Sequence, residues 1–271
     1  MLDLVRLAAV VVVAALGSMV NSIAGGGTLL TFPSLVALGI PPIVANATST
    51  VALWPGSVGS MYGYRHRMRG MGRWAAGFAV PSTIGGAVGA ALLLVTSEER
   101  FSLIVPWLVL GATLLFAAQG PVLRWVKGAP PAGHGPHAPG TVADPLAGFI
   151  PRHSVAALAA QFAVGIYGGY FGAGIGIMML AVLGFLGFTD IHQMNGLKNW
   201  GGTCINFVAA AMFAVSGIVD WAVALAMAIG ATAGGYLAAR IAQKVSQALV
   251  RRTIVGIGLA AGIWLLFARM S

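Results

Sequence analysis

Long apolar segments fill most of this chain of 271 residues. They lie at roughly 4–23, 27–39, 43–63, 73–95 and 101–119, and again at roughly 153–170, 174–187, 191–215, 219–240 and 248–268. A helix needs about 20 apolar residues to cross the hydrocarbon core of a bilayer. Charged residues make up only 8% of the chain, whereas soluble domains carry about 25%. The sequence therefore predicts an all-α polytopic membrane protein. Its net charge of +9 is expected in loops that face the cytoplasm, rather than on a nucleic-acid surface.

Glycines interrupt the apolar pattern at two places. Gly25, Gly26 and Gly27 separate the first two segments, and the run Gly172–Gly176 separates the sixth from the seventh. Glycine weakens a helix by about 1 kcal/mol per residue, and backbone groups freed inside a bilayer must be buried in protein or line a wet cavity. Interrupted segments at matching positions of two halves point to a transporter's binding site. We therefore expect glycine-broken helices near the bilayer midplane, around such a site.

The two sets of segments correspond at a spacing of 147–149 residues, which indicates an internal duplication. The matched positions are Gly25–Gly27 with Gly172–Gly174, Asn46–Thr50 with Asn195–Asn199, Trp74 with Trp221, Gly85–Gly86 with Gly234–Gly235, and Ser97 with Ser246. We expect two repeats of about five helical segments each, at 1–119 and 153–271, joined by a cytoplasmic linker rich in proline, glycine and histidine at 120–152. His134 and His137 of the linker have no further ligands nearby, so no metal site is expected there.

Equivalent loops of the two halves carry opposite charge bias. The basic loops follow the third segment of the first half and the fourth segment of the second half, and they hold Arg65, Arg67, Arg69, Arg73, Arg240, Lys244, Arg251 and Arg252. Their counterparts hold Asp220, and Glu98 and Glu99 with Arg100. Since positive loops face the cytoplasm, the repeats are expected to be inverted, with both termini outside. The second segment of each half, about 13 residues, is too short to span alone. It either crosses obliquely with its predecessor or returns as a hairpin.

Lys198 is the most informative polar residue inside the apolar segments. It lies about seven residues into the segment that starts at Ile191, and a charge at the centre of a membrane helix costs about 2.5 kcal/mol or more. We expect it to contact substrate; snorkelling to the headgroups is the alternative. The full set of expected substrate-binding residues is Gly25, Gly26, Gly27, Thr28, Asn46, Thr48, Ser49, Gly172, Gly174, Asn195, Lys198 and Asn199. Packing or interface roles are expected for Asn21, Gln161, Asn206 and His192.

Anion recognition is the chemistry that this set favours. Helices starting at Thr28 and Ile175 would direct free backbone N–H groups and the positive end of the helix dipole toward the site. Asparagine and hydroxyl side chains add neutral donors, and Lys198 adds a positive charge. No Asp or Glu lies deep in a segment, which disfavours a carboxylate proton relay or a metal cage. The segments also lack the motifs of an intramembrane enzyme, so neither catalysis nor a cofactor is expected.

The chain resembles the sulfite exporter TauE/SafE family, also called the TSUP permeases. The resemblance rests on the stretch Asn21–Phe32, on Gly39–Pro42 followed by Asn46–Ser49, and on Gly172–Gly176 followed by Gly187, Phe188 and Asn195–Asn199. It covers nearly the whole chain apart from the linker. It implies a permease of the prokaryotic inner membrane for sulfite, sulfonates or related sulfur and carbon oxyanions.

We therefore expect a transporter that moves a small sulfur oxyanion or organosulfonate by alternating access. The alternatives are an anion channel-like pore, or an importer of a different small carboxylate or sulfonate; saturable counterflow would separate a carrier from a channel. A membrane scaffold without transport would leave the repeated polar breaks unexplained. The expected partners are the small anion and membrane lipid. The direction of transport, a coupling ion (H⁺ or Na⁺) and a homodimer stay open.

Overall fold

The computed structural model describes residues 4–68, 70–128, 151–188, 190–241 and 247–268. The central part of the predicted linker, with His134 and His137, lies outside these ranges, as does Ser246. Within them the chain forms ten α-helices, one 3-10 helix (η1) and no strand: α1 (Leu4–Ala24), α2 (Thr28–Ala37), α3 (Pro42–Tyr64), η1 (Arg65–Met68), α4 (Gly72–Leu94), α5 (Glu98–Gly128), α6 (Pro151–Tyr170), α7 (Ile175–Phe185), α8 (Ile191–Ser216), α9 (Trp221–Ile241) and α10 (Gln247–Ala268). The ten expected segments correspond to the ten α-helices, so the all-α prediction is confirmed.

Helix α5 is longer than the apolar pattern indicates. The expected segment ends at residue 119, but the helix continues through Pro121 to Gly128. Arg124 and Lys127 end the apolar run but not the helix. Hydropathy marks only the stretch that is compatible with lipid, and the backbone hydrogen bonds of a helix can continue past the end of that stretch. Since α6 begins at Pro151, the stretch predicted as a linker begins and ends in helix.

Apolar side chains point outward from the bundle as well as inward. Val215 is 88% exposed, Val5 79% and Ile229 70%. Such an exterior is unfavourable in water and suits lipid. By length and hydropathy, α1, α4, α5 and α9 qualify as membrane spans among the described helices. Helices α3 and α8 are long enough, at 23 and 26 residues, but their polar residues lower the mean hydropathy.

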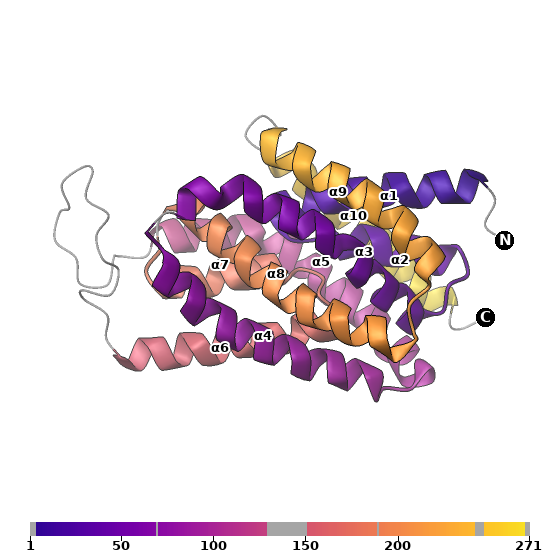
Figure 1. The fold of residues 1–271 in the computed structure, drawn as a ribbon, viewed down its shortest axis with the longest axis horizontal. Coiled ribbons are helices and arrows are strands. Elements are labelled where there is room, and N and C mark those ends of the chain that lie inside the picture. Colours follow the sequence, from indigo (N-terminus) through magenta and orange to yellow (C-terminus); the bar gives the residue numbers. More distant parts are fainter. Residues whose placement is uncertain (1–3, 69, 129–150, 189, 242–246, 269–271) are drawn as a thin grey trace.

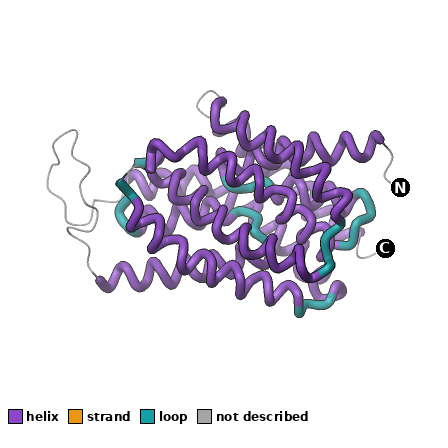
Figure 2. Tube along the Cα trace, in the orientation of Figure 1, coloured by secondary structure: helices purple, strands orange, loops and turns teal. Residues whose placement is uncertain are grey.

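The short second helix of each half folds back on the first. A Cβ added at Gly17 of α1 would lie 2.7 Å from the Thr31 methyl group of α2. The chain reverses after Gly25, which has φ +80° and donates its N–H to the carbonyls of Val20 and Asn21. A left-handed glycine is the usual way to end a helix. Two loops inside the bundle, away from both of its ends, mark these reversals (Figure 2). Of the two alternatives for the short segments, the hairpin is the one observed.

The same backbone turns recur in both halves. Left-handed glycines at Gly25, Gly39 and Gly70 of the first half are matched, 147 or 148 residues later, by Gly172, Gly187 and Gly217. Helix pairings correspond in the same way: α1 packs on α9 as α6 packs on α4, and α3 packs on α9 as α8 packs on α4. The remaining large contacts, α3 with α8 and α5 with α10, join a helix to its own counterpart. This correspondence supports the expected duplication.

Glycines allow the outer helices to approach their partners closely. A Cβ on Gly85 or Gly89 of α4 would collide with backbone carbonyls of α6, and a Cβ on Gly234 of α9 would collide with the carbonyl of Ala15 in α1. Small residues at such crossings permit the backbone contact on which membrane helices rely. Helices α3 and α8 are thereby held at the centre, next to the hairpins.

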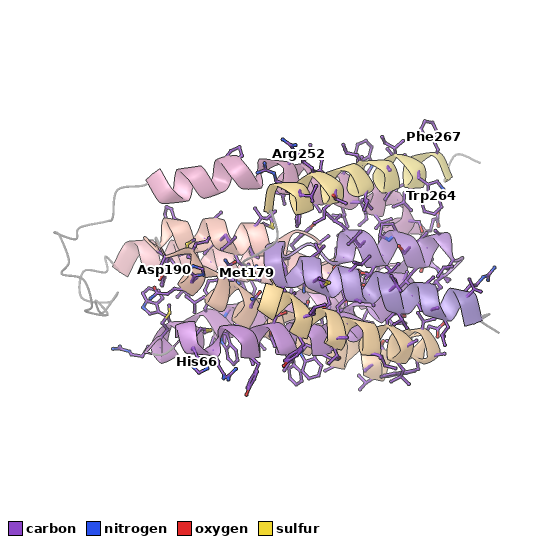
Figure 3. The ribbon with its side chains drawn as sticks, turned by 90° about the horizontal axis from the view of Figure 1, so that it is seen from above. His66, Met179, Asp190, Arg252, Trp264 and Phe267 are labelled. Carbon is purple, nitrogen blue, oxygen red and sulfur yellow. The ribbon has the colours of Figure 1, made fainter. Side chains whose placement is uncertain are left out.

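The two ends of the bundle hold different parts of the chain. Helix α1 begins and α10 ends at the right-hand end of Figure 1, whereas α6 begins at the left-hand end. His66 of η1 and Asp190 lie at the left-hand end and Phe267 at the right-hand end (Figure 3). Glu98, at the start of α5, accepts the N–H of Ile43 at 3.2 Å, so this carboxylate stabilises the N-terminus of α3.

Candidate functional site

A small cavity lies where the tips of the two hairpins meet α3 and α8. The volume that the centre of a water molecule can reach in the cavity is about 20 Å³. A single water needs about 10–15 Å³ by the same measure, so the cavity holds one or two waters. Its lining residues are Asn21, Ser22, Gly25, Ser57, Ser60, Ile175, Gly176, Met179, Lys198, Asn199, Gly202 and Asn206. Met179, which is fully buried, is labelled in Figure 3.

The glycine turns are what let the hairpin tips meet. A Cβ on Gly25 would lie 2.6 Å from the Cα of Gly176, so the two backbones touch at this point. Gly25 is also in the left-handed region, where side chains other than glycine are strained. The first glycine break therefore both reverses the chain and admits the first turn of α7 to the cavity.

Lys198 points into the bundle and not toward its surface. The side chain is 2% exposed, and it is the only buried charged residue among those that the structure describes. Its Nζ donates to the backbone carbonyl of Ser22 at 3.4 Å, near the end of α1. A helix C-terminus stabilises a cation by about 0.3–2 kcal/mol, less than the several kcal/mol that burying an ion costs. A charged Lys198 thus lacks the counter-ion that would offset its burial.

Two neutral groups of the lining are also without partners. The hydroxyl of Ser22 and the amide nitrogen of Asn199 are buried and make no hydrogen bond. Buried polar groups are nearly always hydrogen-bonded, so unsatisfied ones call for an explanation. By contrast, Ser57 and Ser60 donate to carbonyls of their own helix, at 3.3 and 3.0 Å. The unmet groups therefore lie on the α1 and α8 walls of the cavity that Lys198 also lines.

The N-terminus of α7 supplies another wall of the cavity. Ile175 and Gly176, its first two residues, line the cavity. The first N–H groups of a helix have no partner within it, and with the helix dipole they attract anions. The start of α2 is placed differently, because Gly26 packs against the ring of Phe116 and Gly27 against the backbone of Gly17. One helix start reaches the cavity, whereas two were expected.

Three of the twelve expected site residues, Gly25, Lys198 and Asn199, line the cavity. Gly172 and Gly174, both left-handed, form the turn of the second hairpin. Thr28 begins α2 and is only partly buried. Asn195 is buried one turn before Asn199 and its side-chain oxygen has no partner.

The remaining expected side chains connect helices outside the cavity. The Asn46 amide donates to the carbonyl of Tyr170 at 2.9 Å, and the Thr48 hydroxyl accepts the N–H of Asp220 at 3.0 Å. Ser49 and Thr31 share a hydrogen bond of 2.5 Å between their hydroxyls. These contacts hold α3 against α6, the start of α9, and α2, so Asn46, Thr48 and Ser49 support the frame around the site.

The lining also contains residues that sequence reasoning placed elsewhere. Asn21 and Asn206 line the cavity although packing roles were expected for them, and Ser57 and Ser60 were not considered. The spacing of Asn199, Gly202 and Asn206 on one face of α8 is a helical signal that could have found Asn206. The α3 serines carry no comparable signal, because only the packing of α3 on α8 brings them to the site.

The equivalent region of the first half has a different chemistry. Ser49 occupies the position that corresponds to Lys198, and its hydroxyl is bonded to Thr31. Close by in the chain, Phe32 packs edge-on against Phe171 and Phe101, with ring centroids 5.3 and 6.4 Å apart. Aromatic packing surrounds this part of the first half, so the charged group of the site comes from the second half, although Asn21, Ser22 and Gly25 of the first half also line the cavity.

A helical bundle with an apolar exterior, two inward hairpins and a small cavity lined in part by polar side chains defines a polytopic membrane protein of the transporter class. The sequence profile of the sulfite exporter TauE/SafE family matches residues 10–265. The chain belongs to this family, and it is a membrane transporter.

Similar proteins carry consistent names. The chain is 26% identical over 268 residues to a probable membrane transporter protein, ORF9, of Sinorhizobium, which covers 96% of this chain and 92% of that protein. It is 27% identical over 245 residues to a probable membrane transporter protein of Haemophilus influenzae, covering 88% and 86%. It is 28% identical over 251 residues to the probable membrane transporter protein YfcA of Escherichia coli K12, covering 90% and 83%. No solved structure matches the chain significantly.

Proposed function

We propose that this protein carries a small sulfur oxyanion, such as sulfite or an organosulfonate, across the prokaryotic inner membrane by alternating access at the cavity. The observation that carries the proposal is Lys198, a buried cation-forming side chain in a cavity whose lining, in the described part of the chain, holds no acidic residue. An anion bound beside it would supply the missing counter-ion, and a buried charge is tolerated when it is paired and hydrogen-bonded.

The lining offers donors on several sides of such an anion. The Asn199 amide and the Ser22 hydroxyl are unpartnered, and the first turn of α7 faces the same space. An oxyanion presents several acceptor oxygens to these groups at once, which a halide does not. Hydrogen bonds to a charged group are worth about 1.5–3 kcal/mol each, so the arrangement favours oxyanions over chloride.

Alternating access would use the duplicated frame. We infer that the two halves are inverted repeats, because their left-handed glycines and helix pairings correspond while their loop charges are opposite in bias. In transporters of this kind, one repeat rocks against the other around a fixed central site. The cavity, with room for about two waters, would be the closed stage of that cycle, and it would widen toward one end and then the other.

The experiment is a thermal-shift series on the detergent-purified protein with sulfite, sulfate, thiosulfate, methanesulfonate and chloride at matched ionic strength. A ligand at 100 times its Kd stabilises the native state by about 2.7 kcal/mol. We expect an oxyanion to raise the unfolding temperature of the wild type, and Lys198→Met to lose that shift while keeping the apolar bulk of the side chain. Lys198→Arg should keep part of it, since the charge stays but its geometry changes.

Arg252→Gln is the matched control, because it also removes one positive charge but from an exposed position on α10. It should respond to anions as the wild type does. If the anion still raised the unfolding temperature of Lys198→Met, the proposed substrate class would be retained but Lys198 would be excluded from the site. A wild type that responds to no anion, but to a cation or a neutral solute, would contradict the proposal.

A further inference from the structure

We propose that Lys198 carries a proton together with the anion, so that each transport cycle moves one monovalent anion and one proton. The inference rests on the proposed function and names its coupling ion. It starts from the surroundings of the Lys198 amine, which differ between the empty and the loaded cavity.

Among the residues that the structure describes, Lys198 is the only titratable group in the cavity lining. From the α1–α2 hairpin, α3 and α7, the facing residues are Asn21, Ser22, Gly25, Ser57, Ser60 and Gly176. Tyr167 of α6 and Cys204 of α8 do not line the cavity. An ammonium in the empty cavity is therefore a buried charge without a counter-ion, whereas a neutral amine avoids that cost.

Binding an anion reverses this preference. Once an anion lies beside Lys198, the ammonium form has its counter-ion and the neutral form leaves the anion unpaired. Anion binding thus favours proton binding, and by linkage proton binding favours anion binding to the same extent. The Ser22 carbonyl, 3.4 Å from Nζ, can accept an N–H from either form of the amine. The lysine can change its charge without losing this contact.

The proton balance is simple. The lone pair of Nζ takes up a proton when the anion enters from one side, and the N–H bond breaks when the anion leaves on the other side; no bond of the anion changes. The other donors of the lining, Ser22 and Asn199, are neutral throughout. A monovalent anion with the ammonium gives a neutral loaded site. A divalent anion such as sulfate would leave one uncompensated negative charge, so hydrogensulfite or a sulfonate fits better.

The test uses purified protein in liposomes, with methanesulfonate and isethionate as substrates and a pH-sensitive dye inside. Both sulfonates are anions of strong acids, so they cannot carry protons through the lipid in neutral form. With 1:1 coupling, a pH gradient of one unit should accumulate the anion about tenfold on the alkaline side. A membrane potential imposed with K⁺ and valinomycin should have no such effect. The dye should report one proton per anion.

Lys198→Arg separates proton carriage from anion binding. A guanidinium does not lose its proton in proteins, so this variant should still be stabilised by anions but should lose accumulation driven by the pH gradient. The coupling would be overturned if sulfonate movement followed the membrane potential without proton entry. It would also be overturned if Lys198→Arg kept the accumulation driven by the pH gradient. Either result would leave the proposed function intact. If neither sulfonate were transported, the inference would also be overturned. The proposed function falls with it only if the thermal-shift series also finds no stabilising anion.

Discussion

Asn199 lies beside Lys198 in the cavity lining, and its amide nitrogen has no hydrogen-bond partner. Asn199→Asp keeps the shape of the side chain but places a carboxylate next to the lysine. We expect the new carboxylate to act as the internal counter-ion, so that anions no longer stabilise the variant, while its stability without anions equals or exceeds that of the wild type. Thermal unfolding with and without sulfite or methanesulfonate measures both effects.

Asn199→Leu tests the same residue without adding charge. It removes the amide donor, so anion affinity should fall by about 10- to 150-fold, the value of one hydrogen bond to a charged group, but binding should persist. If Asn199→Asp bound anions as tightly as the wild type, Lys198 would not be the group that pairs with them.

At the scale of helices, glycine spacing decides how closely the elements pack. Gly89 and Gly77 lie on the same helix, α4, but a Cβ on Gly89 would collide with the Ile166 carbonyl of α6, whereas a Cβ on Gly77 meets open space. Gly89→Ala should therefore lower the free energy of unfolding by about 1–3 kcal/mol, the usual cost of overpacking. The midpoint of thermal or SDS-induced unfolding in detergent measures this loss.

Gly77→Ala is its control on that helix. Alanine favours helix over glycine by about 1 kcal/mol, so this variant should be as stable as the wild type or slightly more stable. Equal effects of the two substitutions would mean that helix propensity, and not the α4–α6 crossing, determines the stability of this region.

At the scale of the whole molecule, the ends of the bundle predict its orientation. Arg65 and His66 in η1 lie at the end where α6 begins, whereas Ser97 lies between α4 and α5 and Glu98 begins α5. Because basic residues stay on the cytoplasmic side, we expect the η1 end to face the cytoplasm. In a Cys204→Ser background, a membrane-impermeant thiol reagent added to intact cells should label Ser97→Cys and spare His66→Cys. Both side chains are exposed, and the opposite pattern would invert the orientation.

Much of the architecture could be predicted from the sequence because it depends on local properties. Apolar runs and their charged borders mark the helices, since each span must suit lipid along its own length. The glycine breaks mark the reversals, because only glycine readily adopts the left-handed turn found at Gly25 and Gly172. The burial of Lys198 could be expected for the same reason, as its neighbours along α8 leave it in an apolar segment.

Tertiary structure alone decided which polar groups share the site. The sequence motif does not distinguish Asn46 and Ser49, which bond to Tyr170 and Thr31, from Asn199, whose amide is free in the cavity. The two regions differ because α7 begins at the cavity wall, whereas the residues just before α2 pack against the Phe116 ring and the backbone of Gly17. Ser57 joins the lining through the packing of α3 on α8. Hydropathy and spacing act along the chain and determine helices and turns, but the site is made by contacts between helices distant in sequence, which only the packed bundle brings together.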